Sequence, residues 1–469
     1  MTTHAPAEDA TDNALHAASA ARGDGEGAPL ATTRGGHPRA LYLLFTAEMW
    51  ERMSYYGMRA LLVLYMTRAT TAGGFGWSSE SALKLYGLYS GLVYMTPFFG
   101  GIVADRWLGQ RRSMLLGGLL MMIGHFLMAL PGITMFFVAV SFIIVGNGFF
   151  KPNVSTMVGA LYPQNDPRRD AGFTIFYMGI NIGSFLASAI CGTLGEKLGF
   201  HWGFGSAGVG MGLGLVVFAW GAPRFLGRIG VEPSAKRADA ASTSSAATTP
   251  TEPLTKVERD RITVLFVLAF FSVFFWVAFE QAGGLMNLYT DQKVDRVLFG
   301  WEIPTTWFQA LNPIFVVTMA PLVSAVWTRR GAAGKSVSTP KKMALGILLV
   351  SVGFMLMIGA ARVSQTGSKA HMLWIVGAYF FHTAGELCIS PIGLSVVTKL
   401  APARLASMLM GVWFLSNFVS DTLAGFVGSY SEALGDLPLF TSIVVATLVS
   451  ATVLLAVTRP LEMRMHGRD

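Results

Sequence analysis

Acidic, basic and phenolic side chains recur at helical spacing within one otherwise apolar segment. Two acids are followed by an arginine, and two tyrosines and a second arginine continue the pattern. This spacing places the whole set on one face of a helix: Glu48, Glu51, Arg52, Tyr55, Tyr56 and Arg59. Glu48 and Arg52 are four residues apart and can form an ion pair, with Glu51 in the same turn.

These ionisable groups stand inside residues 40–67, which are apolar and long enough to cross a membrane. An ionisable side chain in mid-membrane costs ~2.5 to 3.5 kcal/mol, so four of them facing lipid would cost on the order of 10 kcal/mol. We therefore expect this face to point to the interior of a helix bundle or to water. The alternative is a buried ion network that only fixes helix packing.

Further ionisable residues fall inside other apolar segments: Lys151, Glu280, Glu386 and, as an additional candidate, Asp421. Without Asp421, three cations face four acids, which leaves an unmatched negative charge in a medium of low dielectric constant. Protonation of one acid is the simplest way to remove this charge, and it predicts proton coupling. A bound sodium ion would also balance the charge. The charge would likewise balance if one of these residues were wrongly assigned to the membrane interior.

The composition predicts a membrane protein with many helical spans. Of 469 residues, 52% are hydrophobic and 13% are charged, and the mean hydropathy is +0.51, unlike soluble globular chains. The predicted fold class is an all-α polytopic membrane protein. Twelve apolar segments are each long enough to cross a hydrocarbon core of ~30 Å: 40–67, 83–104, 113–130, 133–157, 171–195, 203–222, 262–290, 306–327, 343–361, 371–398, 405–429 and 438–458.

Polar stretches divide these segments into two sets of six. The predicted organisation is a disordered cytoplasmic tail at 1–38, an N-terminal six-helix bundle at 39–222, a cytoplasmic linker at 223–261, a C-terminal six-helix bundle at 262–459 and a cytoplasmic tail at 460–469. Two such bundles joined by one long linker are typical of transporters that rock about a shared site at the membrane midplane.

The net charge of +8 arises mainly from Lys and Arg in loops on one predicted side of the membrane. Basic runs such as Arg106–Arg112 lie in short loops, and the positive-inside rule then predicts that both termini are cytoplasmic, in the cell (plasma or inner) membrane. The loops lack the folded module of a nucleic-acid reader, so we expect no nucleic-acid partner. Cys191 and Cys388 fall inside predicted spans and imply no disulfide framework.

The sequence gives no indication of an enzyme. It has no cluster with metal-ligand spacing, no nucleophile with a base at helical spacing and no phosphate-binding loop. A channel is disfavoured because no repeated ring of pore residues is visible. We expect no metal and no cofactor, with protons as the coupling ion. The histidines inside spans, His125 and His382, are interpreted as packed polar residues.

Six motifs, in the expected order, resemble the proton-dependent oligopeptide transporter (POT/PTR) family of the major facilitator superfamily over most of residues 41–461. They are Glu48–Gly57, Phe150–Asn153, Phe176–Gly183, Phe275–Gln281, Gln309–Pro313 and Gly385–Pro391. In the first motif, Met53 stands where the family usually has phenylalanine. Another stretch, Gly101–Arg112, resembles the superfamily's loop between the second and third helices, which is a structural latch.

The resemblance implies a proton-coupled symporter that imports di- and tripeptides by alternating access, as a functional monomer in the lipid bilayer. Proton coupling would involve Glu48, Glu51, Arg52, Lys151 and Glu280. Arg59 and Lys151 would meet the peptide carboxylate, and Glu386 its amino group. Bridges between the bundles would pair Arg59 with Glu280 and Lys151 with Glu386. The remaining residues that the resemblance places at the substrate are Tyr55, Tyr56, Tyr94, Tyr177, Asn181, Trp276, Glu280, Asn312, Ser390 and Trp413.

The chemistry of a dipeptide agrees with such a site. A dipeptide is a zwitterion, so fixed cations on one bundle and an acid on the other can hold it lengthwise. The alternative is the same fold with another small solute, such as nitrate or a peptide-like compound; Glu386 disfavours an anion. Taken singly, Tyr94, Tyr177 and Trp413 are also compatible with core or interfacial aromatics.

The sequence departs from the family pattern in two places. Bacterial members commonly have two additional helices between the bundles, and the linker at 223–261 is too short and too polar for them. Asp421 stands where a neutral residue is expected. It is either a further proton site or an acid near the end of its helix.

Overall fold

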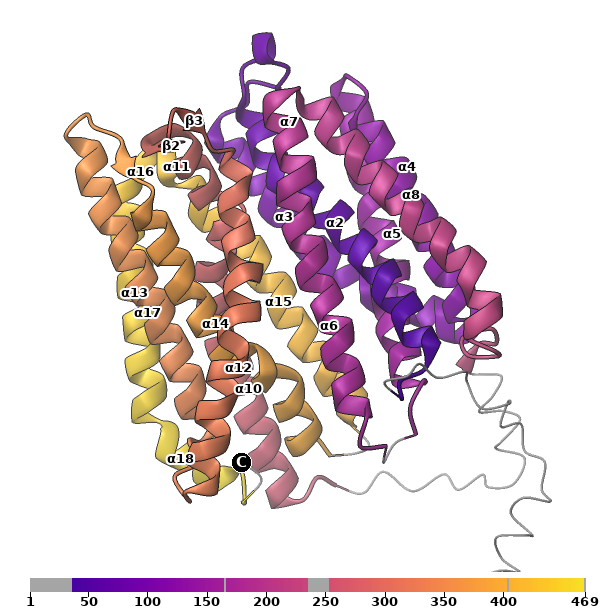
Figure 1. The fold of residues 1–469 in the computed structure, drawn as a ribbon. Helices are drawn as coiled ribbons and strands as arrows, with labels where there is room; N and C mark the ends of the chain where they lie inside the picture. Colours follow the sequence, from indigo (N-terminus) through magenta and orange to yellow (C-terminus); the bar gives the residue numbers. More distant parts are fainter. Residues whose placement is uncertain (1–35, 164–165, 235–252, 403–404, 468–469) are drawn as a thin grey trace, which may run out of the picture.

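The computed structural model describes residues 36–163, 166–234, 253–402 and 405–467. Within these ranges the chain forms long helices, grouped in two halves that stand side by side (Figure 1). Most of the predicted tail at 1–38, and the middle of the predicted linker at 223–261, lie outside the described residues.

The first half consists of helices that follow one another through short turns. Its elements are α2 (Arg39–Thr67), η1 (Thr70–Ala72), α3 (Ser79–Val103), η2 (Ala104–Leu108), α4 (Gln110–Met128), α5 (Ile133–Gly159), α6 (Arg169–Leu186), η3 (Ala187–Gly192), α7 (Thr193–Lys197) and α8 (Phe200–Phe225). The segments η2 and η3 are π-helical, and η1 is a 3-10 turn.

The second half adds two small two-stranded sheets to its helices. Its elements are α10 (Lys256–Phe279), η4 (Glu280–Ala282), α11 (Leu285–Lys293), β1 (Val294–Asp295), β2 (Val297–Leu298), β3 (Trp301–Glu302), η5 (Thr305–Ala310), α12 (Leu311–Ala332), α13 (Thr339–Gln365), β4 (Ala370–His371), α14 (Leu373–Leu400), α15 (Ala406–Ser429), α16 (Ser431–Leu434), α17 (Asp436–Ala456) and α18 (Thr458–Arg464). Strand β1 pairs with β4 in parallel, and β2 with β3 in antiparallel. Strands of two residues carry no readable periodicity, so the sequence did not predict them.

Each of the twelve predicted spans coincides with helix in the structure. Within the described residues, nine helical stretches are long and apolar enough to cross a membrane by length and composition. The other long helices at predicted spans are α2, α4 and α15, which carry more polar side chains, such as Arg111 and Arg112 in α4 and Asn417 and Asp421 in α15. All three helices hold ionisable residues that the sequence analysis singled out.

Three predicted spans are interrupted rather than continuous. The π-helical η3 separates α6 from α7, the 3-10 turn η4 separates α10 from α11, and η5 precedes α12. Irregular backbone is tolerated at membrane depth only where it is buried in protein or lines a cavity. We therefore expect each of these breaks to be buried in protein or to lie beside a cavity.

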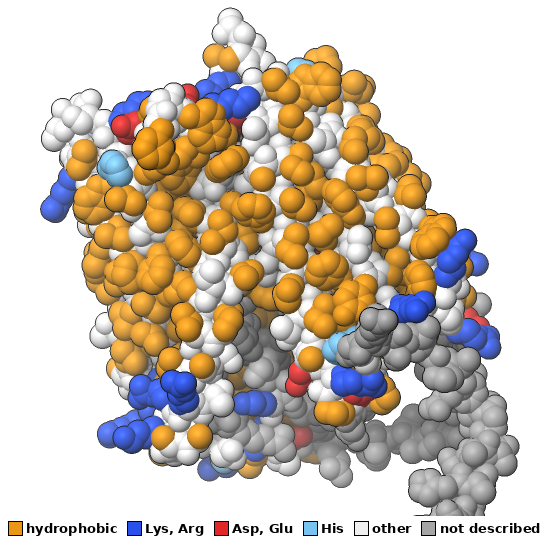
Figure 2. Space-filling view, viewed as in Figure 1, with side chains coloured by type: hydrophobic (Ala, Val, Ile, Leu, Met, Phe, Trp, Pro, Cys, Tyr) orange, Lys and Arg blue, Asp and Glu red, His pale blue; other side chains and the backbone are white. Residues whose placement is uncertain are grey.

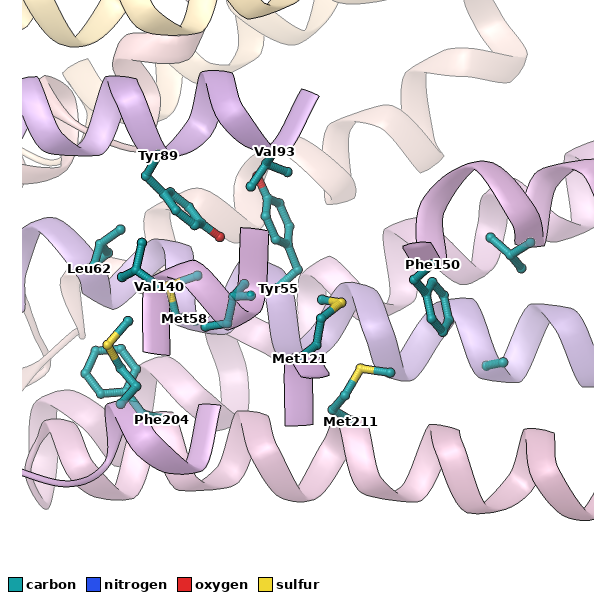
Figure 3. Close-up of a cluster of buried hydrophobic side chains, with 14 of the residues drawn as sticks. Tyr55, Met58, Leu62, Tyr89, Val93, Met121, Val140, Phe150, Phe204 and Met211 are labelled. Atoms are coloured by element: carbon teal, nitrogen blue, oxygen red, sulfur yellow. The ribbon is translucent and has the colours of Figure 1, made fainter. Parts of the chain in front are cut away.

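Each half has its own apolar core. One cluster of buried side chains comes from α2 to α8, with Leu288 added from α11, and a second comes from α10 to α18. Figure 3 shows part of the first cluster, in which Met58, Met121 and Met211 lie among aromatic and aliphatic side chains. Unbranched methionine side chains fill irregular gaps between helices.

The outer surface agrees with a position in a bilayer. Apolar side chains cover the middle of the face in Figure 2, while Lys and Arg gather mainly at its two ends. Large apolar side chains such as Leu322 and Phe270 are more than half exposed. A band of exposed apolar side chains would favour aggregation in water but is the expected surface toward lipid.

The two halves touch backbone to backbone along α3 and α15. A Cβ atom added to Gly87 would lie 2.6 Å from the Cα of Gly425, and one added to Gly91 would lie 2.3 Å from Oγ1 of Thr422. Any larger residue at Gly87 would force the helices apart. We call this contact, made by Gly87 and Gly91 of α3 with Asp421, Thr422 and Gly425 of α15, the seam.

Candidate functional site

Helix α2 positions the ionisable face that the sequence predicts. Its strong helix formers run without an internal proline from Arg39 to Thr67. Gly57 allows α2 to approach η3, because a Cβ there would lie 2.5 Å from Sγ of Cys191. The helix is enclosed on most sides, and its acids are buried rather than turned outward to lipid.

The first cluster on α2 is a compact ion network. Nε of Arg52 lies 3.0 Å from Oε1 of Glu48 and also forms an ion pair with Glu51. Asn147 of α5 donates a hydrogen bond to Glu51 at 3.3 Å. The guanidinium carbon of Arg52 lies 5.4 Å from the ring centre of Tyr55, within the range of a cation–π contact. We call Glu48, Glu51 and Arg52 the lower network.

Two atoms of the lower network are buried without a hydrogen-bond partner among the described residues: Oε2 of Glu48 and Nη2 of Arg52. A buried polar atom that lacks a partner costs about 1 to 3 kcal/mol, and more when it is charged. A structure keeps such atoms where the group exchanges partners or protons, or where ordered water satisfies them. The lower network therefore keeps one carboxylate oxygen and one guanidinium nitrogen without a partner among the described residues.

The second cluster on α2 reaches across to the other half. Arg59 forms an ion pair with Glu280, which belongs to the break η4 in the second half. Nε of Arg59 also donates to the hydroxyl of Tyr86 at 2.6 Å. The break turns Glu280 toward α2, so the interrupted helix provides the partner. We call the Arg59–Glu280 pair the bridge.

The second expected pairing, Lys151 with Glu386, is not formed in this structure. Nζ of Lys151 lies 3.9 Å from the ring centre of Tyr94, within electrostatic range of Glu48, Glu51 and Asp421. Glu386 instead accepts a hydrogen bond of 2.7 Å from Asn312. Each group thus has a partner within its own half.

A cavity lies between the halves, next to the bridge. Of the residues predicted at the substrate, its wall contains Tyr56, Arg59, Glu280 and Asn312. These four side chains come from α2 of the first half and from η4 and α12 of the second. An arginine and a tyrosine of the first half therefore face the same space as an acid and an amide of the second half.

The cavity wall also contains residues that the sequence analysis did not assign to the site: Ser184, Ser188, Gln309, Tyr379 and His382. Two of them could have been found, because Tyr379 and His382 precede Glu386 by seven and four residues and so share its helix face. His382 was interpreted as a packed polar residue, and its side chain is indeed 1% exposed. Ser184 and Ser188 follow Asn181 on a helix that changes pitch at η3, which obscures their register.

The other predicted residues lie outside this cavity wall. Tyr177 is exposed, within electrostatic range of Glu386, and its carbonyl accepts from the amide of Asn181. Trp276 packs against Phe275 and Phe279, with ring centres 5.1 and 5.4 Å away.

Trp413 is buried in the apolar core of the second half, whereas Ser390 is exposed. Neither side chain is part of the cavity wall. For Trp413, the interpretation as a core aromatic describes its position in this conformation.

Polar contacts tie the halves together at the end of the molecule opposite the C-terminus (Figure 1). Glu196 of α7 accepts hydrogen bonds of 2.8 Å from the backbone N–H groups of Thr305 and Thr306, and one of 2.7 Å from the hydroxyl of Thr306. Arg68 forms an ion pair with Asp291 at 3.2 Å. We call this set of contacts the latch of the tied end.

The loop Gly101–Arg112, which resembles the structural latch of the superfamily, makes its contacts at the end of the molecule opposite the tied end. Asp105 accepts a hydrogen bond of 2.9 Å from the hydroxyl of Ser234. Arg111 donates to the carbonyls of Ile229 and Gly227 at 2.6 and 2.7 Å. The loop therefore binds the segment that follows α8, within the first half.

Comparison with known proteins relates the chain to one family. A model of the PTR2 family, described as the POT family, matches residues 111–248 and 251–435. The peptide transporter YePEPT of Yersinia enterocolitica subsp. palearctica is 35% identical over 92% of this chain and 96% of its own length. A di-/tripeptide transporter of Lactococcus lactis subsp. cremoris is 34% identical over 91% of this chain and 96% of its own.

A solved structure agrees with these relatives. The crystal structure of a peptide transporter POT in complex with sulfate superposes with a TM-score of 0.86 at 36% identity, covering 93% of this chain and 97% of that chain. The fold is that of the major facilitator superfamily, and the protein is a multi-pass membrane transporter rather than an enzyme. The chain therefore belongs to the POT family of proton-dependent oligopeptide transporters.

Proposed function

We propose that this protein is a symporter that imports di- and tripeptides together with protons by alternating access. The observation that carries the proposal is the double role of α2. One rigid helix holds a buried carboxylate network in its own half and, two turns further on, an arginine that reaches an acid of the other half. The peptide and di-/tripeptide transporters that resemble the chain support the choice of substrate.

The proton would bind in the lower network. Glu48 and Glu51 share one guanidinium group, so both carboxylates cannot be fully compensated by Arg52 at the same time. Glu51 is completely buried and its neighbour Glu48 nearly so. A proton on one of the two acids removes the excess charge without moving a helix. In the proposed cycle, this proton enters from one side of the membrane and leaves to the other.

The peptide would bind between cations of the first half and an acid of the second. Arg59 and Lys151 supply positive charge for the carboxylate, and Glu386 supplies negative charge for the amino group. In the structure Lys151 rests on Tyr94 and Glu386 on Asn312. Both contacts are exchangeable, so a peptide can replace them when it spans the two halves.

Alternating access would come from breaking the bridge and the latch of the tied end. With the basic loops and both termini on the cytoplasmic side, the tied end would be extracellular, and the described conformation would be closed on that side. A ligand that joins the halves, or a proton that releases the bridge, then changes which end is held closed. The proposed location is the cell membrane, with the protein acting as a monomer.

The direct test is uptake of a labelled dipeptide into vesicles that contain the purified protein. We expect accumulation above equilibrium only with an inward proton gradient, and its loss when a protonophore is added. Excess unlabelled tripeptide should compete, whereas nitrate should not. Uptake that does not depend on the proton gradient would contradict proton coupling. Competition by nitrate alone would contradict a peptide as the substrate.

A further inference from the structure

Asp421 is the buried acid that the proposed cycle leaves without a role. It lies well inside α15 rather than near an end of the helix, and only 4% of its surface is exposed. The sequence allowed two interpretations of this residue, one of which required a position near the helix end. The structure removes that interpretation.

The position of Asp421 is the seam between the two halves. Its backbone carbonyl oxygen would lie 3.0 Å from a Cβ added to Gly87, and the next residue, Thr422, faces Gly91. The backbone of Asp421 thus lies where α3 and α15 approach most closely, and its carboxyl group is buried beside this contact. A change of charge at this place acts on the contact that joins the halves.

The carboxyl group has unused hydrogen-bonding capacity. Oδ2 of Asp421 is buried and has no partner among the described residues. Removing an ionised carboxylate from water without a partner is among the most costly arrangements in a protein. A carboxylic acid, which is neutral, avoids most of that cost.

The charged and titratable groups around Asp421 come from several elements. Those within its electrostatic range are Tyr86 and Tyr94 of α3, Glu280 of η4, Arg59 and Tyr55 of α2, and Lys151 of α5. Arg59 is already bound to Glu280 and to Tyr86, and the ammonium group of Lys151 rests on Tyr94. Both nearby cations therefore have other partners in this conformation.

We propose that Asp421 is a second proton-binding carboxyl group of the transport cycle, separate from the lower network and located in the seam. The inference rests on the proposed function and deepens it. With Asp421 included, the set singled out inside the apolar segments contains five acids, Glu48, Glu51, Glu280, Glu386 and Asp421, against three cations, Arg52, Arg59 and Lys151. Neutrality of the empty site then needs two protons instead of one.

The proton on Asp421 would control the seam. In the protonated state the neutral acid permits the close contact of α3 with α15. When the O–H bond breaks, the proton leaves to water and the carboxylate attracts Lys151 or Arg59, which loosens both the seam and the bridge. Rebinding of a proton from the other side restores the contact, so one proton crosses the membrane per cycle through this group.

The test compares proton-to-peptide ratios in vesicles, measured as the membrane potential at which net peptide flux is zero. Asp421→Asn keeps the shape of the side chain but cannot release a proton, and we expect its ratio to fall by one proton per peptide. Ser420→Ala is the matched control, because this neighbour is buried and, among the described residues, its hydroxyl donates to the carbonyl of Ser416. An unchanged ratio in Asp421→Asn overturns the inference.

A second measurement does not depend on transport. Infrared difference spectra between acidic and alkaline buffer detect the C=O stretch of protonated carboxyl groups, including those of a variant that folds but does not transport. We expect one such band of the wild type to be missing in Asp421→Asn and present in Ser420→Ala. Identical bands in wild type and Asp421→Asn contradict the inference.

The two proposals fail in different ways. A wild-type protein with no proton flux during uptake rejects the proposed function. A wild-type protein with proton flux, whose ratio and infrared bands are the same in Asp421→Asn, rejects only the second proton site.

Discussion

The two charged clusters of α2 differ in what they depend on. The lower network joins Arg52 to acids four positions and one position earlier on the same helix, so its contacts are fixed as soon as the helix forms. The bridge joins residues of two halves and exists only in a conformation that brings η4 against α2. Arg52 and Arg59 are about 10 Å apart along the axis of one helix. The comparison teaches that a local charge site and a conformational contact can be coupled by a single rigid element.

The largest expected effect comes from breaking the bridge on one side. Glu280→Gln leaves the buried guanidinium group of Arg59 without a counter-charge, which we expect to cost ~3 to 5 kcal/mol of stability. The double variant Arg59→Met with Glu280→Leu should recover most of this stability but not transport. Thermal unfolding of the purified variants, together with uptake, measures both.

Additive losses in the double variant would contradict the bridge as a coupled pair. The ion pair of Lys84 with Glu80, which lies on the exposed surface of α3, is the matched control. Glu80→Gln should change stability by less than about 1 kcal/mol, because exposed pairs contribute little.

The next effect concerns the lower network. In Glu51→Gln, Arg52 keeps its pairing with Glu48 but the second proton acceptor is gone. We expect gradient-driven accumulation to be lost, while exchange of external for internal peptide without a gradient continues. Thr46→Ala, at a half-buried position of α2 where the hydroxyl donates to the carbonyl of Tyr42, should retain both activities. Normal accumulation in Glu51→Gln would move the coupling site elsewhere.

A smaller effect is expected at the latch of the tied end. Glu196 accepts three hydrogen bonds at the start of η5, and Glu196→Gln removes the charge that strengthens them. The loss of about 1 to 3 kcal/mol should shift the population toward a state open at that end. Distances between spin labels placed on α7 and η5 report this shift.

Glu302 provides the control for the tied end, because its exposed side chain pairs with Arg296 of its own half and its contact with Lys197 uses the backbone carbonyl. Glu302→Gln should leave the distance distribution unchanged. Equal shifts in the two variants would mean that general charge at this end, rather than the hydrogen bonds of Glu196, holds it closed.

The smallest effect tests the environment of Glu51. Asn147 donates to Glu51 through a long hydrogen bond of 3.3 Å, so Asn147→Ala should cost at most about 1 kcal/mol. Removing a donor to the carboxylate favours its protonated form, so the pH dependence of uptake should move toward alkaline pH by less than one pH unit. A shift toward acidic pH would show that Asn147 does not stabilise the charged form.

The sequence was sufficient to predict the face of α2, because the positions of its charges follow one helical repeat. It also predicted the twelve spans, since length and hydropathy are local properties. It could not predict that Glu280 lies in a break of its helix, because a 3-10 turn of three residues leaves the apolar pattern intact. Nor could it predict the contact of Glu196 with η5, which joins residues more than a hundred positions apart.

The contacts of some residues depend on the conformation of the protein and cannot be derived from the sequence alone. Lys151 and Glu386 were expected to pair, yet each lies against a partner of its own half. Tyr379 and His382 share a face with Glu386, and only the identity of the neighbouring helix decides that this face borders a cavity. The motifs identify the candidate site residues, but the arrangement of the two halves determines which of these residues are in contact.

The glycines of the seam have a mechanical consequence. Where two helices meet through backbone atoms, no interlocking side chains need to leave one set of grooves and enter another when the helices tilt. Such a contact allows two helices to tilt against each other without side chains having to separate first. The close contact leaves no room for a side chain, so a single methyl group added at Gly87 would push α3 and α15 apart.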